Sequence, residues 1–462
     1  MPRLSLLSAL LLAACAARPA AAPDAPALVC PVADRGAPAV VPADMSRTPA
    51  VAARLLLRNA RLIDGSGGAP QDGVDVLIEA GKISAVGKAL PAPPDAQLLD
   101  LGGRTLLPGL IDAHTHLLGE RPGSHAESVA RGVTETDADA ALRGAAHARA
   151  TLLAGFTTVR DVGGTAAIRS LRDAVAAGRV AGPRILAANF AIGSTGGHCD
   201  DTNGLRPDVF PGQPDFRTGV ADGADEARKA VRHQVKLGAD VIKICATGGV
   251  LSSGDGADNP QLTDAELAAI VDEAVRLGRK VAAHAHGTAG IKAAARAGVH
   301  SIEHGSLLDA DAIALMKKRG TFLVPTVYVG KVVVQAADAG QLAADSAAKA
   351  RFIGPKMHDS FARAVKAGVK IAFGTDAGVF PHGDNAREFE VMVALGMKPA
   401  DAIVAATRSA AELLGLADVG QVRPGFVADL LAVDGDPLQD IRALQRPALV
   451  IQGGRVVRPL SP

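Results

Sequence analysis

The chain has 462 residues, of which 48% are hydrophobic, and its 49 basic and 48 acidic residues leave a formal net charge of +1. This length allows either more than one domain or one large α/β barrel with an added part, and the apolar content is sufficient for a large core. A net charge so near zero gives no indication of binding to nucleic acid or to a charged membrane surface.

The first 22 residues differ in composition from the rest of the chain. Arg3 provides a short positive segment, and residues 4–14 are mostly apolar but too few to cross a bilayer as a helix. This pattern is typical of an export signal. The string Leu12–Cys15 also resembles a bacterial lipobox, with ordinary cleavage near residues 20–22 as the alternative. We therefore expect a periplasmic protein or a lipoprotein that is anchored to the membrane through Cys15.

Residues 23–52 are rich in Ala and Pro and are predicted to be a tether. The sequence leaves open whether Cys30 and Cys199 form a disulfide, which an oxidising compartment would permit, because it does not supply their separation. Cys245 lies two residues beyond Lys243 and is expected to be a small buried apolar residue.

Short strands with turn residues between them are predicted at both ends of the remaining chain. Residues 53–105 contain LLLRNARLID, a Gly-Ser-Gly-Gly turn and VDVLIEAGKISAVG, and residues 421–462 contain FVADLLAVDG and PALVIQGGRVV. Alternating apolar and polar residues in such short runs indicate strands. We predict one small β-sandwich domain that is formed from both ends of the chain.

Between residues 106 and 420, apolar runs alternate with amphipathic stretches such as AELAAIVDEAVRLG, which is the pattern of parallel βαβ units. Eight strands are predicted, at Leu110–His116, Thr157–Gly163, Arg184–Ile192, Val241–Ala246, Lys280–His286, Ser301–His304, Phe322–Val327 and Ile371–Asp376. Eight such units predict an α/β fold with a (β/α)8 TIM barrel, in which catalytic residues come from the carboxyl ends of the strands.

Six side chains near these carboxyl ends form a candidate metal site. Imidazoles and carboxylates are usual ligands of zinc and similar divalent ions. A free lysine ammonium cannot bind a cation, but a lysine that has reacted with CO2 is a carbamate, an anion that can bridge two metals. The predicted ligands are His114, His116, Lys243, His284, His304 and Asp376.

The motifs PGLIDAHTH, VIKICATGGVLS, VAAHAHG, SIEHG and GTDAG follow one another along the chain. In this order they resemble the motifs of the metal-dependent amidohydrolase superfamily, and the resemblance covers nearly all of the chain after the tether. Lys243 together with GGHCDDTNG resembles the branch of bacterial Xaa-Pro dipeptidases and carboxypeptidases, which also contains enzymes that hydrolyse ochratoxin A. Cys199 stands where many relatives have Gly, which leaves the conformation of this loop open.

The resemblance implies a centre with two divalent metals, of which zinc is our first expectation. It assigns His114, His116 and Asp376 to the more buried metal and His284 and His304 to the more exposed one. Carboxylated Lys243 would bridge the two metals together with a hydroxide. The implied reaction is attack of that hydroxide on the carbonyl of an amide, with Asp376 as the proton carrier.

The resemblance also implies the substrate class, which is a dipeptide or an N-acyl amino acid with a free carboxylate, ochratoxin A included. A cyclic-amide hydrolase or lactonase with the same ligands is the first alternative, and a non-catalytic binding or assembly protein is the second. Relatives often form large assemblies, so a homo-oligomer is expected. Four side chains at or after the ends of predicted strands are candidates for substrate binding, namely His198, His286, Tyr328 and His382. His147 and His233 lie in helical patterns and are expected at the surface.

Overall fold

The computed structural model describes residues 54–120, 124–206 and 212–460. The predicted signal and tether, with Cys15 and Cys30, lie outside these ranges. Within the described ranges, no helix is both long enough and apolar enough to cross a membrane.

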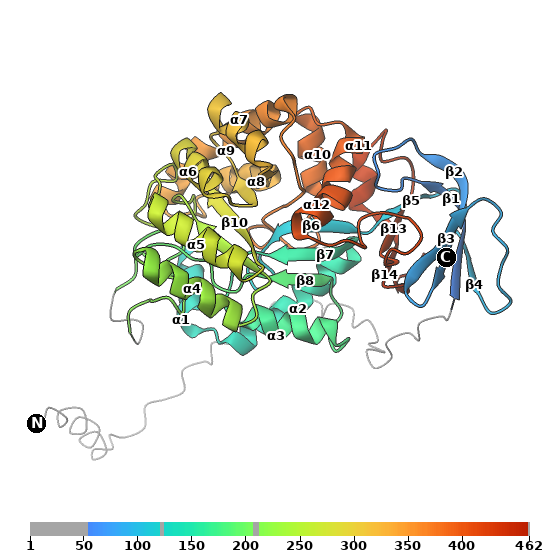
Figure 1. The fold of residues 1–462 in the computed structure, drawn as a ribbon, viewed down its shortest axis with the longest axis horizontal. Coiled ribbons are helices and arrows are strands. Elements are labelled where there is room, and N and C mark those ends of the chain that lie inside the picture. Colours follow the sequence, from blue (N-terminus) through green and yellow to red (C-terminus); the bar gives the residue numbers. More distant parts are fainter. Residues whose placement is uncertain (1–53, 121–123, 207–211, 461–462) are drawn as a thin grey trace, which may run out of the picture. The chain divides into compact units, whose positions relative to one another are not determined.

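Both ends of the chain contribute strands to one sheet, which lies at the right of Figure 1. The strands are β1 (Arg54–Leu62), β2 (Gln71–Glu79), β3 (Lys82–Gly87), β4 (Gln97–Asp100), β5 (Thr105–Pro108), β13 (Leu430–Val433), β14 (Pro447–Gln452) and β15 (Arg455–Arg458). Their order is β15-β14-β13-β5-β1-β2-β3, with β4 also paired to β1. The predicted β-sandwich is thus one hydrogen-bonded sheet of eight strands, because β13 pairs antiparallel with β5 and joins the two ends.

The central part contains parallel strands in two further sheets. One sheet holds β6 (Leu110–Thr115), β7 (Phe156–Asp161) and β8 (Arg184–Ala187), and the other holds β9 (Val241–Cys245), β10 (Lys280–Ala285), β11 (Ser301–His304) and β12 (Phe322–Val324). Single parallel bridges extend these ladders, at Ile192–Ile244, Leu323–Ile371 and Thr115–Ala377. Seven of the eight predicted strands are therefore present in the described part of the chain.

The predicted eighth strand, Ile371–Asp376, is not a regular strand. Ile371 makes only a single bridge to Leu323, and Asp376 has a left-handed backbone with a φ of 64°. Regular strands have a negative φ, so the left-handed Asp376 marks the point at which an extended segment would end. The seventh strand ends early for the same reason, because Thr326 has a φ of 49° and the next helix starts at Val327.

Helices follow the parallel strands along the chain and lie around them in Figure 1. The helices are α1 (His125–Thr134), α2 (Asp137–Leu153), α3 (Ala167–Ala176), α4 (Ala224–Lys236), α5 (Asp264–Arg276), α6 (Thr288–Ala297), α7 (Ala310–Arg319), α8 (Val327–Asp338), α9 (Ala344–Ala367), α10 (Arg387–Ala394), α11 (Pro399–Val404) and α12 (Ala410–Leu414). Their apolar faces, for example Val231 of α4 and Ile270 of α5, pack in one core with strand residues such as Ile242 and Val281.

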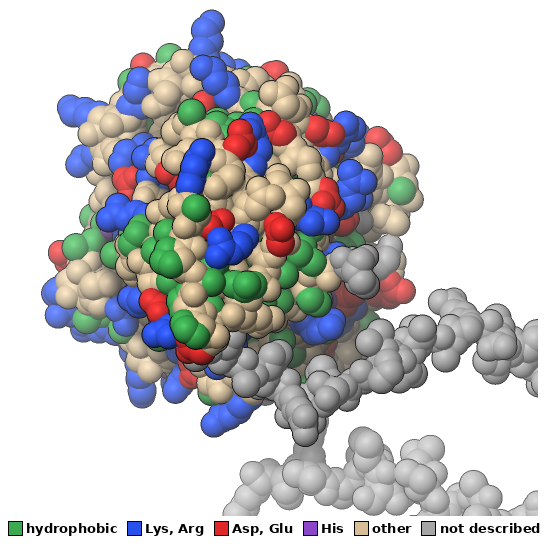
Figure 2. All heavy atoms as spheres, turned by 90° about the vertical axis from the view of Figure 1, so that its right-hand side faces the viewer, with side chains coloured by type: hydrophobic (Ala, Val, Ile, Leu, Met, Phe, Trp, Pro, Cys, Tyr) green, Lys and Arg blue, Asp and Glu red, His purple; other side chains and the backbone are tan. Residues whose placement is uncertain are grey.

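Charged side chains of both signs are interspersed on the face shown in Figure 2, where Lys and Arg alternate with Asp and Glu. This agrees with the balanced composition, and this face has no extended field of one sign.

Candidate functional site

One cavity of about 550 Å³ brings together most of the predicted site residues. Its lining includes all six predicted ligands, which are His114, His116, Lys243, His284, His304 and Asp376. His198 and His286 also line the cavity. The lining also includes apolar side chains such as Val250, Val329 and Met357, which belong to one apolar cluster.

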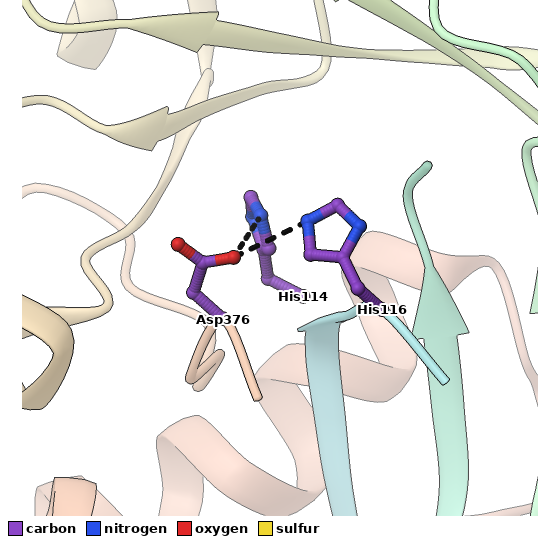
Figure 3. Close-up of side chains that lie close together, drawn as sticks. All are labelled: His114, His116 and Asp376. Atoms are coloured by element: carbon purple, nitrogen blue, oxygen red, sulfur yellow. Dashed lines mark ion pairs between the residues drawn. The ribbon is translucent and has the colours of Figure 1, made fainter. Parts of the chain in front are cut away.

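Three of these residues converge closely, as Figure 3 shows. Asp376 Oδ1 lies 3.5 Å from His114 Nε2 and 3.2 Å from His116 Nε2. The two histidines come from the end of β6, and Asp376 comes from the loop after the bridge at Ile371. Three potential ligand atoms thus lie within 4.8 Å of one another, which is close enough for one divalent ion.

The hydrogen bonds at Nδ1 of His114 and His116 indicate that the space between their Nε2 atoms and Asp376 suits a cation. His114 Nδ1 lies 2.7 Å from Glu303 Oε2, and His116 Nδ1 lies 3.1 Å from the Gly163 carbonyl oxygen. Both oxygens accept, so each Nδ1 donates, and whenever the ring is neutral the lone pair of its Nε2 points towards Asp376. Two lone pairs and a carboxylate then face one another, and a cation between them satisfies all three.

Further histidine rings are packed beside this group. The ring centre of His304 lies 4.9 Å from that of His114 and 4.8 Å from that of His284. His304 Nδ1 is hydrogen-bonded to Thr326 Oγ1 at 2.7 Å, which leaves Nε2 for a ligand. His284 Nε2 donates to the Gly248 carbonyl oxygen at 3.1 Å, which leaves Nδ1.

Burial keeps most of these imidazoles neutral. It lowers the pKa of His114 to about 4, and it lowers the pKa values of His284 and His304 well below the usual 6.5. His116 differs: burial lowers its pKa most, but the hydrogen bond to Asp376 and the charges of Asp376 and Asp161 together raise its pKa above the usual value while no cation is bound. Burial alone would raise the pKa of Asp376, but His116 and the neighbouring charges lower it. Neutral imidazole and ionised carboxylate are the forms that bind metals.

Lys243 lies on β9 and is 4% exposed. Burial lowers its pKa to about 8, against the opposing charges of Glu303 and Asp376. A neutral amine is the form of lysine that can react with CO2. The chemistry that the sequence predicted for Lys243 is therefore compatible with its surroundings.

Two site residues have unusual backbone conformations. His304 has a φ of 68° and Asp376 a φ of 64°, both in the left-handed region. Such a conformation costs about 1–3 kcal/mol for a residue other than Gly and occurs preferentially at functional sites. The two strained residues, His304 and Asp376, both have side chains that line the cavity.

Buried charged residues that the sequence analysis missed support the site. Glu303, next to His304 on β11, is fully buried and accepts from Arg160 Nη2 at 2.8 Å. Asp112 accepts from the backbone N–H groups of His114 and Thr375, both at 3.1 Å. The available signal was a charge within an apolar strand run, since such charges are rarely buried without a partner.

Tyr328 and His382 are not among the residues that line the cavity. Tyr328 is in α8, and its ring packs edge-on against Phe380 with 4.9 Å between ring centres. His382 stacks on His147 at 4.3 Å and lies 3.2 Å from the carbonyl oxygen of Gly119. His147 and His233 are both partly exposed, so each lies at the edge of the surface rather than fully on it.

The cysteines pair differently from the predicted alternative. Cys199 forms a disulfide with Cys245, with 5.9 Å between their Cα atoms. The question that the sequence left open, whether Cys199 pairs with Cys30, is thereby answered for Cys199, and Cys245 is not merely a small buried side chain. The loop after β8 passes beside the end of β9 and brings the two residues into the usual range of a disulfide.

Comparisons with known proteins agree on one family. A model described as the Amidohydrolase family matches residues 105–457. An ochratoxinase from Aspergillus niger is 35% identical over 369 residues, which cover 76% of this chain and 75% of that protein. A crystal structure of a Xaa-Pro dipeptidase with bound methionine in the active site is 41% identical, with a TM-score of 0.84 over 88% of this chain and all of the other. A prolidase complexed with N-methylphosphonate-L-proline is 34% identical, with a TM-score of 0.81 over 88% of this chain and 100% of that one.

Proposed function

Because this chain belongs to the amidohydrolase family and is a hydrolase of C–N bonds, we propose that it cleaves peptide-like amides with the help of two divalent metals. The proposed substrates are dipeptides and N-acyl amino acids with a free carboxylate. The observation that carries the proposal is the convergence of all six predicted ligands on one cavity. A non-catalytic binding protein would have no need for this set of side chains.

The donor set supports a place for both metals. His114, His116 and Asp376 would hold one ion, and His284 and His304 would hold the other. Lys243, as its CO2-derived carbamate, would lie between them. Bound divalent ions, of which zinc is our first choice, supply Lewis acidity and lower the pKa of a shared water.

Asp376 is the proposed proton carrier. Its lowered pKa keeps it ionised, so its carboxylate can accept the proton of the attacking water. It then delivers that proton to the amide nitrogen, which leaves only when protonated. The left-handed backbone of Asp376 accompanies a side chain that lies beside His114 and His116, where the proposed attacking water would be held.

The remaining lining supports a substrate with one apolar and one polar end. Val250, Val329 and Met357 form an apolar surface that suits an aliphatic or aromatic group. His198 and His286 are neutral because burial lowers their pKa values, to about 4 and about 3. A neutral imidazole can donate one hydrogen bond to a substrate carboxylate. The relatives named ochratoxinase and Xaa-Pro dipeptidase both fit this substrate class.

The finer architecture belongs to the same proposal. We propose that the parallel segments of residues 106–420 close into a (β/α)8 TIM barrel, which the three single bridges support. Residues 53–105 and 421–462 would form the flanking sheet domain. A periplasmic or lipid-anchored location and a homo-oligomeric state are proposed with it, and a disulfide in the folded part suits an oxidising compartment.

A metal and substrate screen tests this function. We expect about two equivalents of divalent metal per chain, loss of activity on chelation, and recovery when metal is returned. Xaa-Pro dipeptides and N-acyl amino acids, ochratoxin A included, should be hydrolysed faster than cyclic amides or lactones. Asp376→Asn is the matched variant, and its kcat should fall by about 10²–10⁴-fold. Fully active metal-free protein would contradict the proposal, and faster turnover of lactones or cyclic amides would favour the alternative activity.

A further inference from the structure

The loop after β8 carries His198 to the cavity without regular secondary structure. Within the loop, Asp200 Oδ2 accepts from Gly196 N at 3.0 Å and Asp200 Oδ1 accepts from Thr202 N at 3.1 Å. Asn203 Nδ2 donates to the Ser253 carbonyl oxygen at 2.8 Å. The loop thus has a defined internal shape, and this contact joins it to another loop rather than to a strand.

The Cys199–Cys245 disulfide links this loop covalently to a strand. Cys245 is the last residue of β9 and follows Lys243 by two residues, so the bond ends beside the proposed metal ligands. Both cysteines line the cavity. The approach is close, because a Cβ on Gly193 would lie 2.8 Å from Cys199 Cβ, which only a glycine at position 193 avoids.

His198 is the residue directly before Cys199, so the disulfide also restrains its position. Its ring centre lies 4.2 Å from that of His284, and its backbone N–H donates to Gln261 Oε1 at 2.8 Å. A Cβ on Gly249 would lie 2.2 Å from His198 Nδ1, so the ring is held between His284 and bare backbone. Within the described residues, this buried Nδ1 has no hydrogen-bond partner. The ring is therefore positioned by packing and by its loop.

We propose that the Cys199–Cys245 disulfide is a redox-sensitive positioning element, which holds His198 in the cavity for contact with the substrate. This inference rests on the proposed amide hydrolysis and adds a control of substrate binding to it. Reduction by a dithiol breaks the S–S bond with two electrons and two protons, leaving two thiols, while the dithiol becomes its own disulfide. The loop is then held only by noncovalent packing and hydrogen bonds, and His198 can leave His284 more readily.

The expected effect is on substrate binding more than on the chemical step. The proposed ligands come from strand ends, and they keep their positions when the loop is released. We therefore expect Cys199→Ser, Cys245→Ser and the double variant each to raise KM by about tenfold, with kcat within about twofold of the wild-type value. Metal content should stay the same in all three.

Two comparisons separate the bond from the individual side chains. Because either substitution removes the bond, the double variant should be no worse than each single variant, which is strong non-additivity. Dithiothreitol should raise the KM of the wild-type protein and reoxidation should restore it. The double variant is the control for metal stripping by the thiol, and its KM should not respond. The proposal would be overturned if the two substitutions raised KM additively. It would also be overturned if dithiothreitol raised the KM of the double variant as much as that of the wild-type protein.

Two further measurements need no substrate. After unfolding, reduction should expose two more alkylatable thiols in the wild-type protein than in the same protein left unreduced, at Cys199 and Cys245. Amide hydrogen exchange of residues 194–206 should be faster in the double variant, while β9 and β10 stay protected. An unchanged loop overturns the positioning role. A protein that hydrolyses no amide but shows faster exchange would overturn the proposed function and still support the positioning of the loop by the disulfide.

Discussion

Glu303 holds His114 in one orientation, with 2.7 Å between Glu303 Oε2 and His114 Nδ1 and both side chains buried. Burial alone would raise the pKa of Glu303, but the charge of Arg160 and the bond with His114 bring it down to about 2. The carboxylate is therefore ionised at neutral pH and accepts the Nδ1 proton. This fixes the tautomer in which His114 Nε2 faces Asp376, which is the form a metal needs.

Replacing this carboxylate should weaken metal binding. In Glu303→Gln the charge is lost and the amide can donate as well as accept, so His114 is no longer held as the Nδ1–H tautomer. We expect the metal affinity to fall by about 10–100-fold, measured by competition with a chromogenic chelator.

Glu266→Gln provides a matched control. Glu266 is also a buried glutamate, but it caps α5 through Thr263 and accepts from Gly223 N at 2.7 Å. This variant should lower the thermal stability and leave the metal affinity unchanged. If Glu303→Gln binds metal as tightly as the wild-type protein, Glu303 does not position His114.

Arg160 neutralises Glu303 inside the core, and its removal should be costly for folding. Arg160 is 1% exposed and donates to Glu303 Oε1, Ser301 Oγ and the Ala113 carbonyl oxygen. Arg160→Met leaves a buried carboxylate without its cation, so we expect a loss of about 3–5 kcal/mol in the free energy of unfolding, measured with denaturant. Adding Glu303→Gln should recover part of that loss. Additive losses in the double variant would show that the two side chains do not stabilise each other.

The sequence was sufficient to predict that the six candidate ligands lie around one cavity. Apolar runs that end in His or Asp mark strand ends, and the carboxyl ends of parallel strands lie on one side of a sheet. His114 and Asp376 could therefore be assigned to one site although 262 residues separate them in the chain. The family motifs added Lys243 and the order of the strands.

The sequence was insufficient where side-chain direction or loop path decides the contact. Glu303 lies beside His304, and only the structure shows that it turns to His114. The partner of Cys199 depends on where its loop meets β9, which no local pattern encodes. Tyr328 was expected just after a strand, but the left-handed Thr326 ends that strand early and starts a helix.

An ion-pair cluster on α4 and α5 should make stability depend on pH in the acidic range. Hydrogen bonds from Arg232 and Arg276 lower the pKa of Glu273 from 4.5 to about 2. A lowered pKa in the folded state stabilises the protein above pH 4.5, and this stabilisation is lost as the pH falls towards 2. Glu273→Gln should therefore melt at a lower temperature than the wild-type protein at pH 7, and the difference should shrink between pH 4.5 and 2.

The neighbouring Asp272 serves as the control for this measurement. Its side chain is 64% exposed and pairs with Arg228, so Asp272→Asn should change the melting temperature little at any pH. A gap between Glu273→Gln and wild type that stays constant down to pH 2 would mean that packing, and not the charge of Glu273, accounts for the difference.

Lys243 should be required for metal retention because it is the only proposed ligand that must be modified to bind. Lys243→Ala removes the carbamate and opens space in a cavity where the lysine is buried, so we expect loss of metal and of activity. Formate or acetate in the buffer should restore part of both, since a small carboxylate can take the place of the carbamate between the two ions. Lys280→Ala is the control. Lys280 is the first residue of β10, at the end of the strand away from His284, and donates to the Glu412 carbonyl oxygen at 2.9 Å. Full metal content in Lys243→Ala, measured by plasma emission after gel filtration, would rule out a bridging carbamate at this position.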